Sequence, residues 1–443
     1  MAPPDRSTTS EQPSPPTDIP GAAAAETNSD TPVALGALAP ELSGSLGEYV
    51  RAWAMRIRSG ESGVLPVIGG LILLVIIFQA KDSVFLSAGN LVNLLVQGSV
   101  FILLGMAEIW VLVLGEIDLS VGYVAGIGGT VTAILSTTHN LPWWLAVIAA
   151  VAATGAIGAV WGTLVIRLRL PSFVVTLAGL LGMEGLLLYL VNANGTGGTI
   201  RITNNVLFDV ANGNLSTTAG WILMVLAIAG FGGVTILRDR HRRKSGLEAP
   251  PLAVTMLKVS VMAAAGIALV LVCNTDRGVL VPLKGVPYVV LVVLGFLAVW
   301  TFILGRTRFG RYLYAIGNNA EAARRAGISL GWNRLWAFTL TGVTAGAAGI
   351  VYASRLGSIS NNIDGGTLVL YAVASAVIGG ASLFGGRGKM VYALLGGLVI
   401  ATIYNGMGLL GLAASYQYMV TALVLLAAVT IDSLARRGRE TTA

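Results

Sequence analysis

Long apolar runs are the feature that most constrains the fold of this chain. Segments such as VLPVIGGLILLVIIF and YMVTALVLLAAVTI approach the roughly 20 apolar residues that a helix needs to cross a lipid bilayer. Over 443 residues, hydrophobic residues make up 55% and charged residues only 11%, and the mean hydropathy is +0.79. Because a segment in lipid must satisfy its backbone hydrogen bonds internally, the sequence predicts an all-α polytopic membrane protein.

The apolar pattern predicts about 12 spanning helices. Glycines and polar residues interrupt several of them, so we expect broken or re-entrant segments. The predicted spans cover residues 64–79, 93–114, 119–137, 143–165, 173–191, 220–237, 254–273, 287–305, 334–353, 368–384, 390–410 and 416–432.

The positive charges support this number of spans. With both termini placed inside the cell, 21 Lys and Arg residues fall in inner segments and five in outer ones, as the positive-inside rule expects. If one span were absent, the loops after it would change sides and the excess of basic residues inside would be lost. Topology therefore accounts for the net charge of +7, which gives no support to nucleic-acid binding.

The polar ends suggest a simple domain organisation. Residues 1–45 are rich in Pro, Ser, Thr and Ala and lack an apolar stretch, so we expect a disordered cytoplasmic tail rather than a signal peptide or a folded domain. Residues 46–60 place apolar side chains on one helical face, which is typical of a helix on the inner membrane surface; a plain extension of the first span is an equal alternative. The transmembrane domain is expected over 61–435 and a cytoplasmic tail over 436–443.

Polar residues interrupt the apolar sequence between the second and third spans, in VLVLGEIDLSVGYVAG. We predict a helix break at Glu116, Asp118 and Gly122, which is tolerable in a membrane only where protein buries it or it lines a wet cavity. Asp118 and Ser120 are good helix N-cap residues. They are also acidic and hydroxyl side chains beside a span, so lining of a transport pathway is the second interpretation.

The longest inner loop, residues 306–333, carries a compact helix signal over 319–327. Asn318 or Asn319 fits the N-cap and Gly327 the C-terminal end. Between them lie the remaining residues of the signal, Glu321, Ala322, Ala323, Arg324 and Arg325. A helix that contacts a partner subunit and a helix held against its own bundle are both compatible with this pattern.

Three segments of the sequence resemble motifs of a known family of membrane proteins. The segment GEIDLSVG is similar to the Gly-Gly-Ile-Asp-Leu-Ser-Val-Gly signature of permease subunits from ATP-binding-cassette (ABC) monosaccharide importers of the ribose, xylose and galactose group. RTRFGRYLYAIGNNAEAARRAGI resembles the cytoplasmic loop of that family, and VIGGASLFGGRGK with NGMGLLG resembles its C-terminal segment. The resemblance runs in order from about residue 85 to 435. The chain departs from the family pattern in two places. Glu116 replaces a glycine, and an extra pair of spans lies around 220–273. The extra pair makes the chain most similar to the longer, xylose-type permeases.

The resemblance implies a homodimeric, multi-pass permease in the bacterial cytoplasmic (inner) membrane, surrounded by lipid, that moves a monosaccharide, with a pentose such as xylose favoured, into the cell. It further implies an ABC ATPase subunit on the cytoplasmic side, which binds the ATP, and an external sugar-binding protein. The 319–327 helix would then be the coupling helix that docks on the ATPase, formed by Asn319, Glu321, Ala322, Ala323, Arg324 and Gly327.

The chain itself carries no signature of catalysis. A phosphate-binding loop needs Gly-x-x-x-x-Gly-Lys-Ser/Thr, and neither GRTRFGR nor GGASLFGGRGK fits it. The two histidines and the single cysteine, Cys273, form no metal-ligand pattern, so we predict no metal site, no cofactor and no enzymatic activity.

Polar side chains near span centres and breaks are the pathway candidates. For the three amide residues among them, hydrogen bonding between helices is an equal interpretation. The candidates are Asn93, Gln97, Asp118, Ser120 and Asn405.

The main alternative function is a proton-coupled secondary transporter. Glu108 and Glu184 fall within predicted spans, with Glu116 and Asp118 nearby, and intramembrane carboxylates can relay protons. The inner helix has no evident role in such a carrier. A structural or signalling membrane protein is a third possibility, although no effector domain is attached.

The predicted topology can be tested with reporter fusions. Fusions at Gly246 and after Arg439 should report a cytoplasmic location, because both sites lie beside segments rich in Lys and Arg. A fusion at Gly213 should report the outside, because the loop around it has few basic residues. An outside signal at Gly246 would show that the extra pair of spans is misassigned.

Overall fold

The computed structural model describes residues 47, 51, 64–247, 249–278 and 281–440. The expected tail over 1–45 lies outside these residues, as does nearly all of the expected surface helix over 46–60. The described chain is helical apart from one short pair of strands.

Helices of the described chain follow the predicted order. Most are long, and the shortest three are α8, α12 and α13. The elements are α3 (Leu65–Lys81), α4 (Ala88–Leu112), α5 (Val121–Ala133) with its π-helical end η2 (Ile134–Thr138), α6 (Trp143–Leu168), α7 (Ser172–Asn194), β1 (Thr199–Arg201), α8 (Asn205–Asn212), α9 (Thr217–Lys244), α10 (Leu252–Asn274), α11 (Tyr288–Arg306), α12 (Arg308–Asn318), α13 (Ala320–Arg325), α14 (Leu330–Leu356), β2 (Ser358–Ser360), α15 (Gly365–Ile378), α16 (Met390–Leu409) and α17 (Ala414–Glu440).

Each of the twelve predicted segments coincides with one of these helices. Within the described part of the chain, nine helices are long and apolar enough to cross a membrane, and α3 and α15 are shorter apolar helices. The predicted boundary at residue 435 falls inside α17, which continues to Glu440.

The predicted span 368–384 is too long at its C-terminal end, because α15 ends at Ile378. The backbone of Gly379 lies so close to α16 that an added Cβ would be 1.8 Å from the carbonyl oxygen of Tyr392. Gly380, Gly385 and Gly386 have positive φ angles of 115°, 85° and 74°, which a continuing right-handed helix does not allow.

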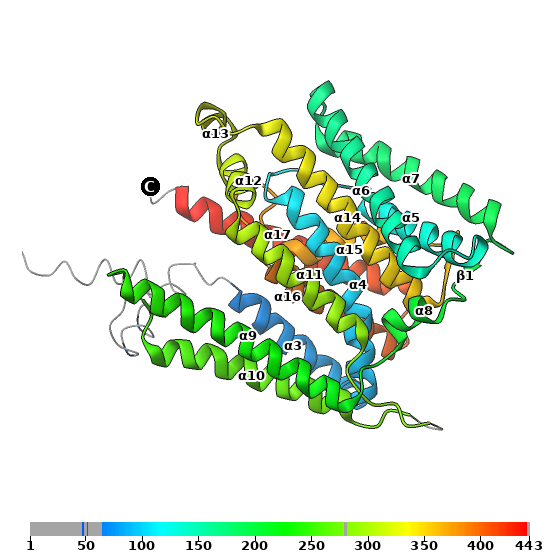
Figure 1. The fold of residues 1–443 in the computed structure, drawn as a ribbon, viewed down its shortest axis with the longest axis horizontal. Coiled ribbons are helices and arrows are strands. Elements are labelled where there is room, and N and C mark those ends of the chain that lie inside the picture. Colours follow the sequence, from blue (N-terminus) through cyan, green and yellow to red (C-terminus); the bar gives the residue numbers. More distant parts are fainter. Residues whose placement is uncertain (1–46, 48–50, 52–63, 248, 279–280, 441–443) are drawn as a thin grey trace, which may run out of the picture.

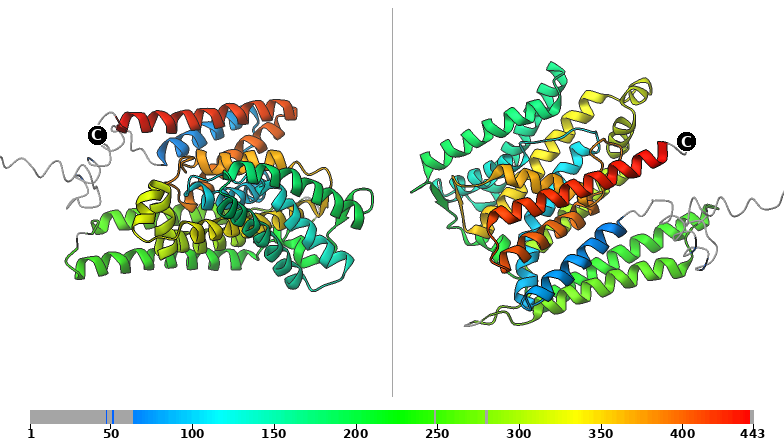
Figure 2. Two further views of the ribbon diagram at one scale, coloured as in Figure 1. Left: turned by 90° about the horizontal axis from the view of Figure 1, so that it is seen from above. Right: turned by 180° about the vertical axis from the view of Figure 1, so that it is seen from behind.

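The centre of the bundle is formed by α4 with α5, α14, α15 and α16 around it (Figure 1). Of the most apolar window of each helix, 83% is buried in α4 and 78% in α5, against 11% in α9 and in α10. The extra helix pair α9–α10 therefore lies at the edge of the bundle, on the side opposite α6 and α7 (Figures 1 and 2).

Glycines permit the close approach of the central helices. A Cβ at Gly158 of α6 would be 2.1 Å from the Phe338 carbonyl oxygen, and one at Gly349 of α14 would be 1.7 Å from the Ala125 carbonyl oxygen. In lipid, helices associate through such small-residue contacts because apolar side chains gain little by leaving the lipid tails.

The two ends of the bundle differ. One end carries α12, α13, the α9–α10 connection and the C-terminal end of α17, and the other carries α8 and the β1–β2 pair (Figure 1). Thr199 to Arg201 pair antiparallel with Ser358 to Ser360. The basic run at the end of α9 and the two arginines of α13 thus lie at the same end, as the charge bias predicts.

Candidate functional site

The break predicted between the second and third spans is present and enters the bundle. α4 ends at Leu112 and α5 begins at Val121. Ile117 contacts the first turn of α7, where its N–H donates to Ser172 Oγ (3.4 Å) and its carbonyl accepts from Thr176 Oγ1 (3.2 Å). Ser120 instead lies near Gly179, where an added Cβ would be 3.3 Å from the Ser120 Cβ. Three to seven residues of helix correspond to a rise of about 5–10 Å, so residues 113–120, the re-entrant segment, run into the bundle along α7 before α5 begins.

Asp118 and Ser120 stabilise the turn before α5. Both are buried, and Asp118 Oδ1 accepts hydrogen bonds from the backbone N–H (2.9 Å) and the hydroxyl (2.6 Å) of Ser120. Ser120 occupies the N-cap position of α5, but its side chain makes no capping hydrogen bond. The prediction of side-chain capping is wrong here, because the hydroxyl donates to Asp118 instead of accepting from the helix.

Gly122 marks a contact between two helices that begin inside the bundle. A Cβ at Gly122 would be 2.0 Å from the carbonyl oxygen of Gly365, the first residue of α15. Only glycine allows this approach. The N-terminal ends of α5 and α15 therefore meet at the break.

Parts of the three segments that carry the family resemblance converge at one end of the bundle, whereas NGMGLLG begins at Asn405 near the other end. The Gly386 N–H donates to the carbonyl oxygen of Val113 (2.9 Å). A Cβ at Gly317, at the end of α12, would be 1.9 Å from the same oxygen. Tyr314 of α12 donates its hydroxyl to the carbonyl oxygen of Gly388. The end of α4, the end of α12 and the glycine-rich 379–389 segment thus form one packed unit.

Glu116, the residue of unassigned role in the sequence, forms an ion pair with Arg334. Glu116 Oε1 lies 3.1 Å from Arg334 Nη2, and the side chains are only 14% and 31% exposed. Arg334 is in the first turns of α14. This pair links the re-entrant segment to the helix that follows the 306–333 loop.

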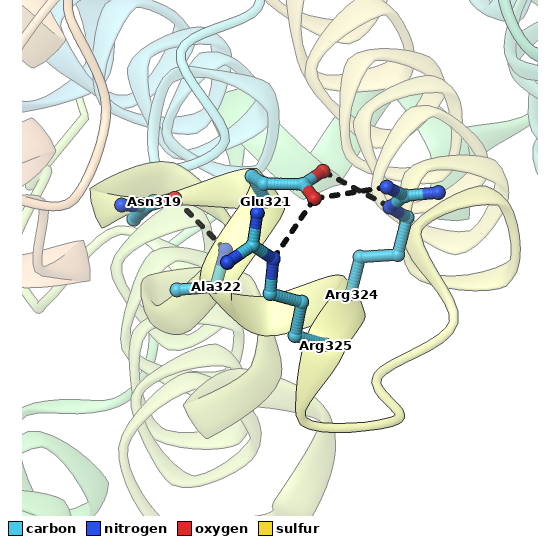
Figure 3. A network of polar contacts seen from close by, with 5 residues as sticks. All are labelled: Asn319, Glu321, Ala322, Arg324 and Arg325. Atoms are coloured by element: carbon cyan, nitrogen blue, oxygen red, sulfur yellow. Dashed lines mark hydrogen bonds and ion pairs between the residues drawn. The ribbon is translucent and has the colours of Figure 1, made fainter.

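The predicted inner helix is α13, and its local structure agrees with the sequence signals. The side chain of Asn319, not Asn318, caps it by accepting from the Ala322 N–H (2.9 Å) (Figure 3). Gly327 has φ +80°. Its N–H donates to Arg324 O and that of Ile328 to Ala323 O, both at 3.0 Å. These two bonds are the Schellman arrangement that ends helices.

The side chains of α13 divide into an anchored and a free set. Ala323 is buried against the bundle, whereas Glu321, Ala322, Arg324 and Arg325 are exposed. Glu321 accepts from both Arg324 (2.9 and 3.0 Å) and Arg325 (3.1 Å) (Figure 3). These hydrogen bonds hold the pKa of Glu321 below its usual range, so the pairs are present at neutral pH and would be lost only as the pH falls through that lowered pKa.

The other pathway candidates lie at the opposite end, around the first half of α4. Asn93 lines cavities of about 420 and 210 Å³, and Gln97 lines the 210 Å³ cavity and a third of about 190 Å³. Asn405 also lines the 210 Å³ cavity. The candidates are therefore two separate groups, one at the break and one at these cavities.

Asn405 has a partner that the sequence did not indicate. It exchanges two hydrogen bonds with Asn90 of α4, Nδ2 to Oδ1 in each direction, at 2.8 and 2.9 Å. Asn90 also donates to Phe85 O (2.8 Å). Asn405 thus joins α16 to α4 as well as facing the cavity.

The carboxylates of the proton-relay alternative have different surroundings, and Glu108 lies close enough to Asp118 to interact with it electrostatically. Glu108 is fully buried in α4, and neither of its oxygens has a hydrogen-bond partner there. Glu116 is engaged by Arg334. Within the same residues, no group of three or more His, Cys, Asp and Glu side chains is placed to hold a metal ion.

The apolar bundle, with one helix projecting at one end and polar cavities at the other, defines a multi-pass membrane protein of the permease class. Residues 90–429 match the model of the family described as branched-chain amino acid transport system / permease component, and the chain belongs to this family.

Three similar proteins are sugar permeases by name. The chain is 36% identical over 355 residues to a xylose transport system permease protein of Haemophilus influenzae, covering 80% of this chain and 91% of the relative. It is 34% identical to the xylose transport system permease protein of Escherichia coli, with coverages of 86% and 94%. It is 30% identical to the ribose import permease protein of E. coli, with coverages of 87% and 96%. No solved structure matches the chain.

The Glu116–Arg334 pair can be tested by a double-mutant cycle with Glu116→Gln and Arg334→Gln. Because both side chains are largely buried, we expect each single variant to lower the melting temperature in detergent and the double variant to lower it by less than the sum, with a coupling energy of about 1 kcal/mol.

The matched control is the exposed pair of Lys284 and Asp276, which are 3.5 Å apart with side chains 46% and 41% exposed. Lys284→Gln should change the melting temperature little, because exposed pairs contribute little. Additive effects at Glu116 and Arg334 would show that their proximity has no energetic consequence.

Proposed function

We propose that this chain is the permease subunit of an ABC importer that moves a monosaccharide into the cell, with a pentose such as xylose as the favoured substrate. The observation that carries the proposal is similarity to sugar permeases over nearly their whole length. The family is described by branched-chain amino acid transport, but the xylose and ribose permeases among the relatives are named for sugar transport.

In this proposal the subunit has twelve spans, with both termini inside, in the bacterial inner membrane. It works as a homodimer surrounded by lipid, with the pathway enclosed between two copies. An external sugar-binding protein delivers the substrate at the end with the polar cavities. A separate ATPase subunit binds and hydrolyses ATP at the end with α13, and this chain supplies no ATPase site of its own.

The geometry around α13 supports a coupling role. A helix of six residues gains little stability from its own hydrogen bonds, yet α13 is fixed by a side-chain cap, a Schellman end and two internal ion pairs. Its exposed charged face is free to contact another subunit. α12, which precedes it, packs on the re-entrant segment, so a displacement of α13 would reach the break through direct contacts.

Energy coupling can be tested by reconstitution. In liposomes this chain alone should neither hydrolyse ATP nor accumulate xylose, because its sequence has no phosphate-binding loop. With its ATPase and its binding protein it should do both. Accumulation of sugar by the chain alone, driven by an imposed proton gradient, would support the secondary transporter instead.

The coupling role of α13 can be tested with Glu321→Arg and Gly327→Leu. The first places a third positive charge beside Arg324 and Arg325, and the second puts a side chain where φ is +80°. We expect co-purification of the ATPase to fall about fivefold or more, as for loss of an interface residue worth over 1 kcal/mol. Insertion of the permease should not change.

Lys81→Glu, an exposed charge reversal at the opposite end, is the control and should leave ATPase association intact. If both α13 variants retain association and uptake, the 306–333 loop is only a connector.

A further inference from the structure

The first half of α4 separates three adjoining cavities at the end of the bundle away from α13. The cavities measure about 420, 190 and 210 Å³. Arg355, at the end of α14, lines the first two, and Gln97 lines the last two. The 190 Å³ cavity is therefore the place where Gln97 and Arg355 face a common space.

Gln97 has an unsatisfied hydrogen-bond acceptor. The residue is only 9% exposed, and its Oε1 is buried without a hydrogen-bond partner among the described residues. Buried polar atoms in folded proteins nearly always have a partner. An unsatisfied acceptor on a residue that lines a cavity points to a donor that enters the cavity.

Arg355 supplies the complementary group. No hydrogen bond or ion pair of its half-buried guanidinium is found within the described part of the chain. The nearby acid Asp364 is engaged elsewhere: it caps α15 by accepting from the Thr367 N–H (2.9 Å). A guanidinium offers five N–H donors and no acceptor.

Arg277 shows what a structural arginine looks like at the same end. It also lines the 420 Å³ cavity, but it donates to the carbonyl oxygens of Cys273 and Gly285 and to Asn214 Oδ1. Its donors fix the loop before α11. This contrast indicates that the guanidinium of Arg355 is available to bind a ligand, whereas that of Arg277 stabilises the fold.

Aromatic rings form part of the wall of the 190 Å³ cavity, which Asp364, Thr367 and Gln417 also line. Phe101, Tyr371 and Tyr404 are arranged edge to face, with centroid distances of 5.1, 5.8 and 6.2 Å. Pockets for small molecules combine such apolar walls with a few polar groups that fix orientation. The volume is below the roughly 300–1,000 Å³ of pockets for drug-sized ligands, which suits a smaller molecule.

We propose that Gln97 and Arg355 form a binding subsite for a neutral monosaccharide within the permease itself. Arg355 donates to sugar hydroxyl oxygens, and Gln97 Oε1 accepts from a sugar hydroxyl. A hydroxyl both donates and accepts, so one polyol satisfies both residues, whereas a carboxylate would satisfy only the arginine. This assignment rests on the proposed importer function and adds the residues that recognise the sugar after the binding protein releases it.

The test uses the complete importer, with its ATPase and its binding protein, reconstituted in liposomes with radiolabelled D-xylose. The variants are Gln97→Leu, Arg355→Met and Arg355→Lys. The control is Arg201→Met, which removes an exposed arginine on β1 that lines none of the three cavities. Initial uptake and sugar-stimulated ATP hydrolysis are measured on the same vesicles.

Gln97→Leu and Arg355→Met should each reduce xylose uptake about tenfold or more, as expected when a site built for a hydroxyl loses its partner. Stimulated hydrolysis should stay within about twofold of wild type, because the contacts at the α13 end are unchanged. Fewer sugar molecules then enter per ATP. Arg355→Lys should be intermediate, since lysine keeps the charge but not the planar donor set, and Arg201→Met should behave as wild type.

A parallel fall in uptake and hydrolysis would assign Gln97 and Arg355 a structural role and overturn the subsite. Unchanged uptake in both variants would also overturn it while leaving the importer function in place. If the wild-type importer moves leucine but not xylose or ribose, the proposed function itself fails, and the subsite assignment fails with it.

Discussion

The central physical constraint in this structure is the need to satisfy peptide groups of a non-helical segment inside a membrane protein. Water is absent from the hydrocarbon region, so each unpaired N–H or carbonyl there is costly. The residues between α4 and α5 meet this requirement through contacts with distant elements: Val113 O with Gly386, and Ile117 with Ser172 and Thr176. The break can exist only because α7 and the 379–389 segment surround it, which ties the positions of these elements together.

α4 connects this constraint to the other end of the molecule. Its 25 residues span about 37 Å at 1.5 Å per residue. One end terminates at the break, next to α12, and the other carries Asn93 and Gln97 in the cavity walls. Since α4 is buried along most of its length, small tilts would require neighbouring helices to move as well. A signal at α13 therefore has a direct physical route, through packed groups, to the proposed sugar subsite.

Sequence reasoning succeeded where the signals are local. Hydropathy placed each of the twelve helical segments, and residue type and spacing placed the end at Gly327 and limited the cap to Asn318 or Asn319, of which the structure selects Asn319. It could not find the Glu116–Arg334 pair or the Asn90–Asn405 pair, whose partners are separated by 218 positions or more along the chain. It placed the end of α15 too late for a different reason, because the apolar sequence continues past Ile378 although Gly380, Gly385 and Gly386 have positive φ angles. The sequence identified Gln97 as a polar residue in a span. It could not show that Gln97 Oε1 lacks a hydrogen-bond partner, because this depends on how the other helices pack around it.

The two departures from the family pattern, the α9–α10 pair and Glu116, differ in how closely they are connected to the rest of the fold. The α9–α10 pair is at the edge, with only 11% of each apolar window buried, so its removal would leave the break, α13 and most of the cavity walls in place. Glu116 is different, because it directly follows the end of α4 in that packed unit and pairs with Arg334. A glycine there would free the turn and leave Arg334 without its carboxylate. The charged pair therefore reduces backbone freedom at the break and fixes a link to α14, the helix that begins beside the α13 loop and carries Arg355 in its last turn.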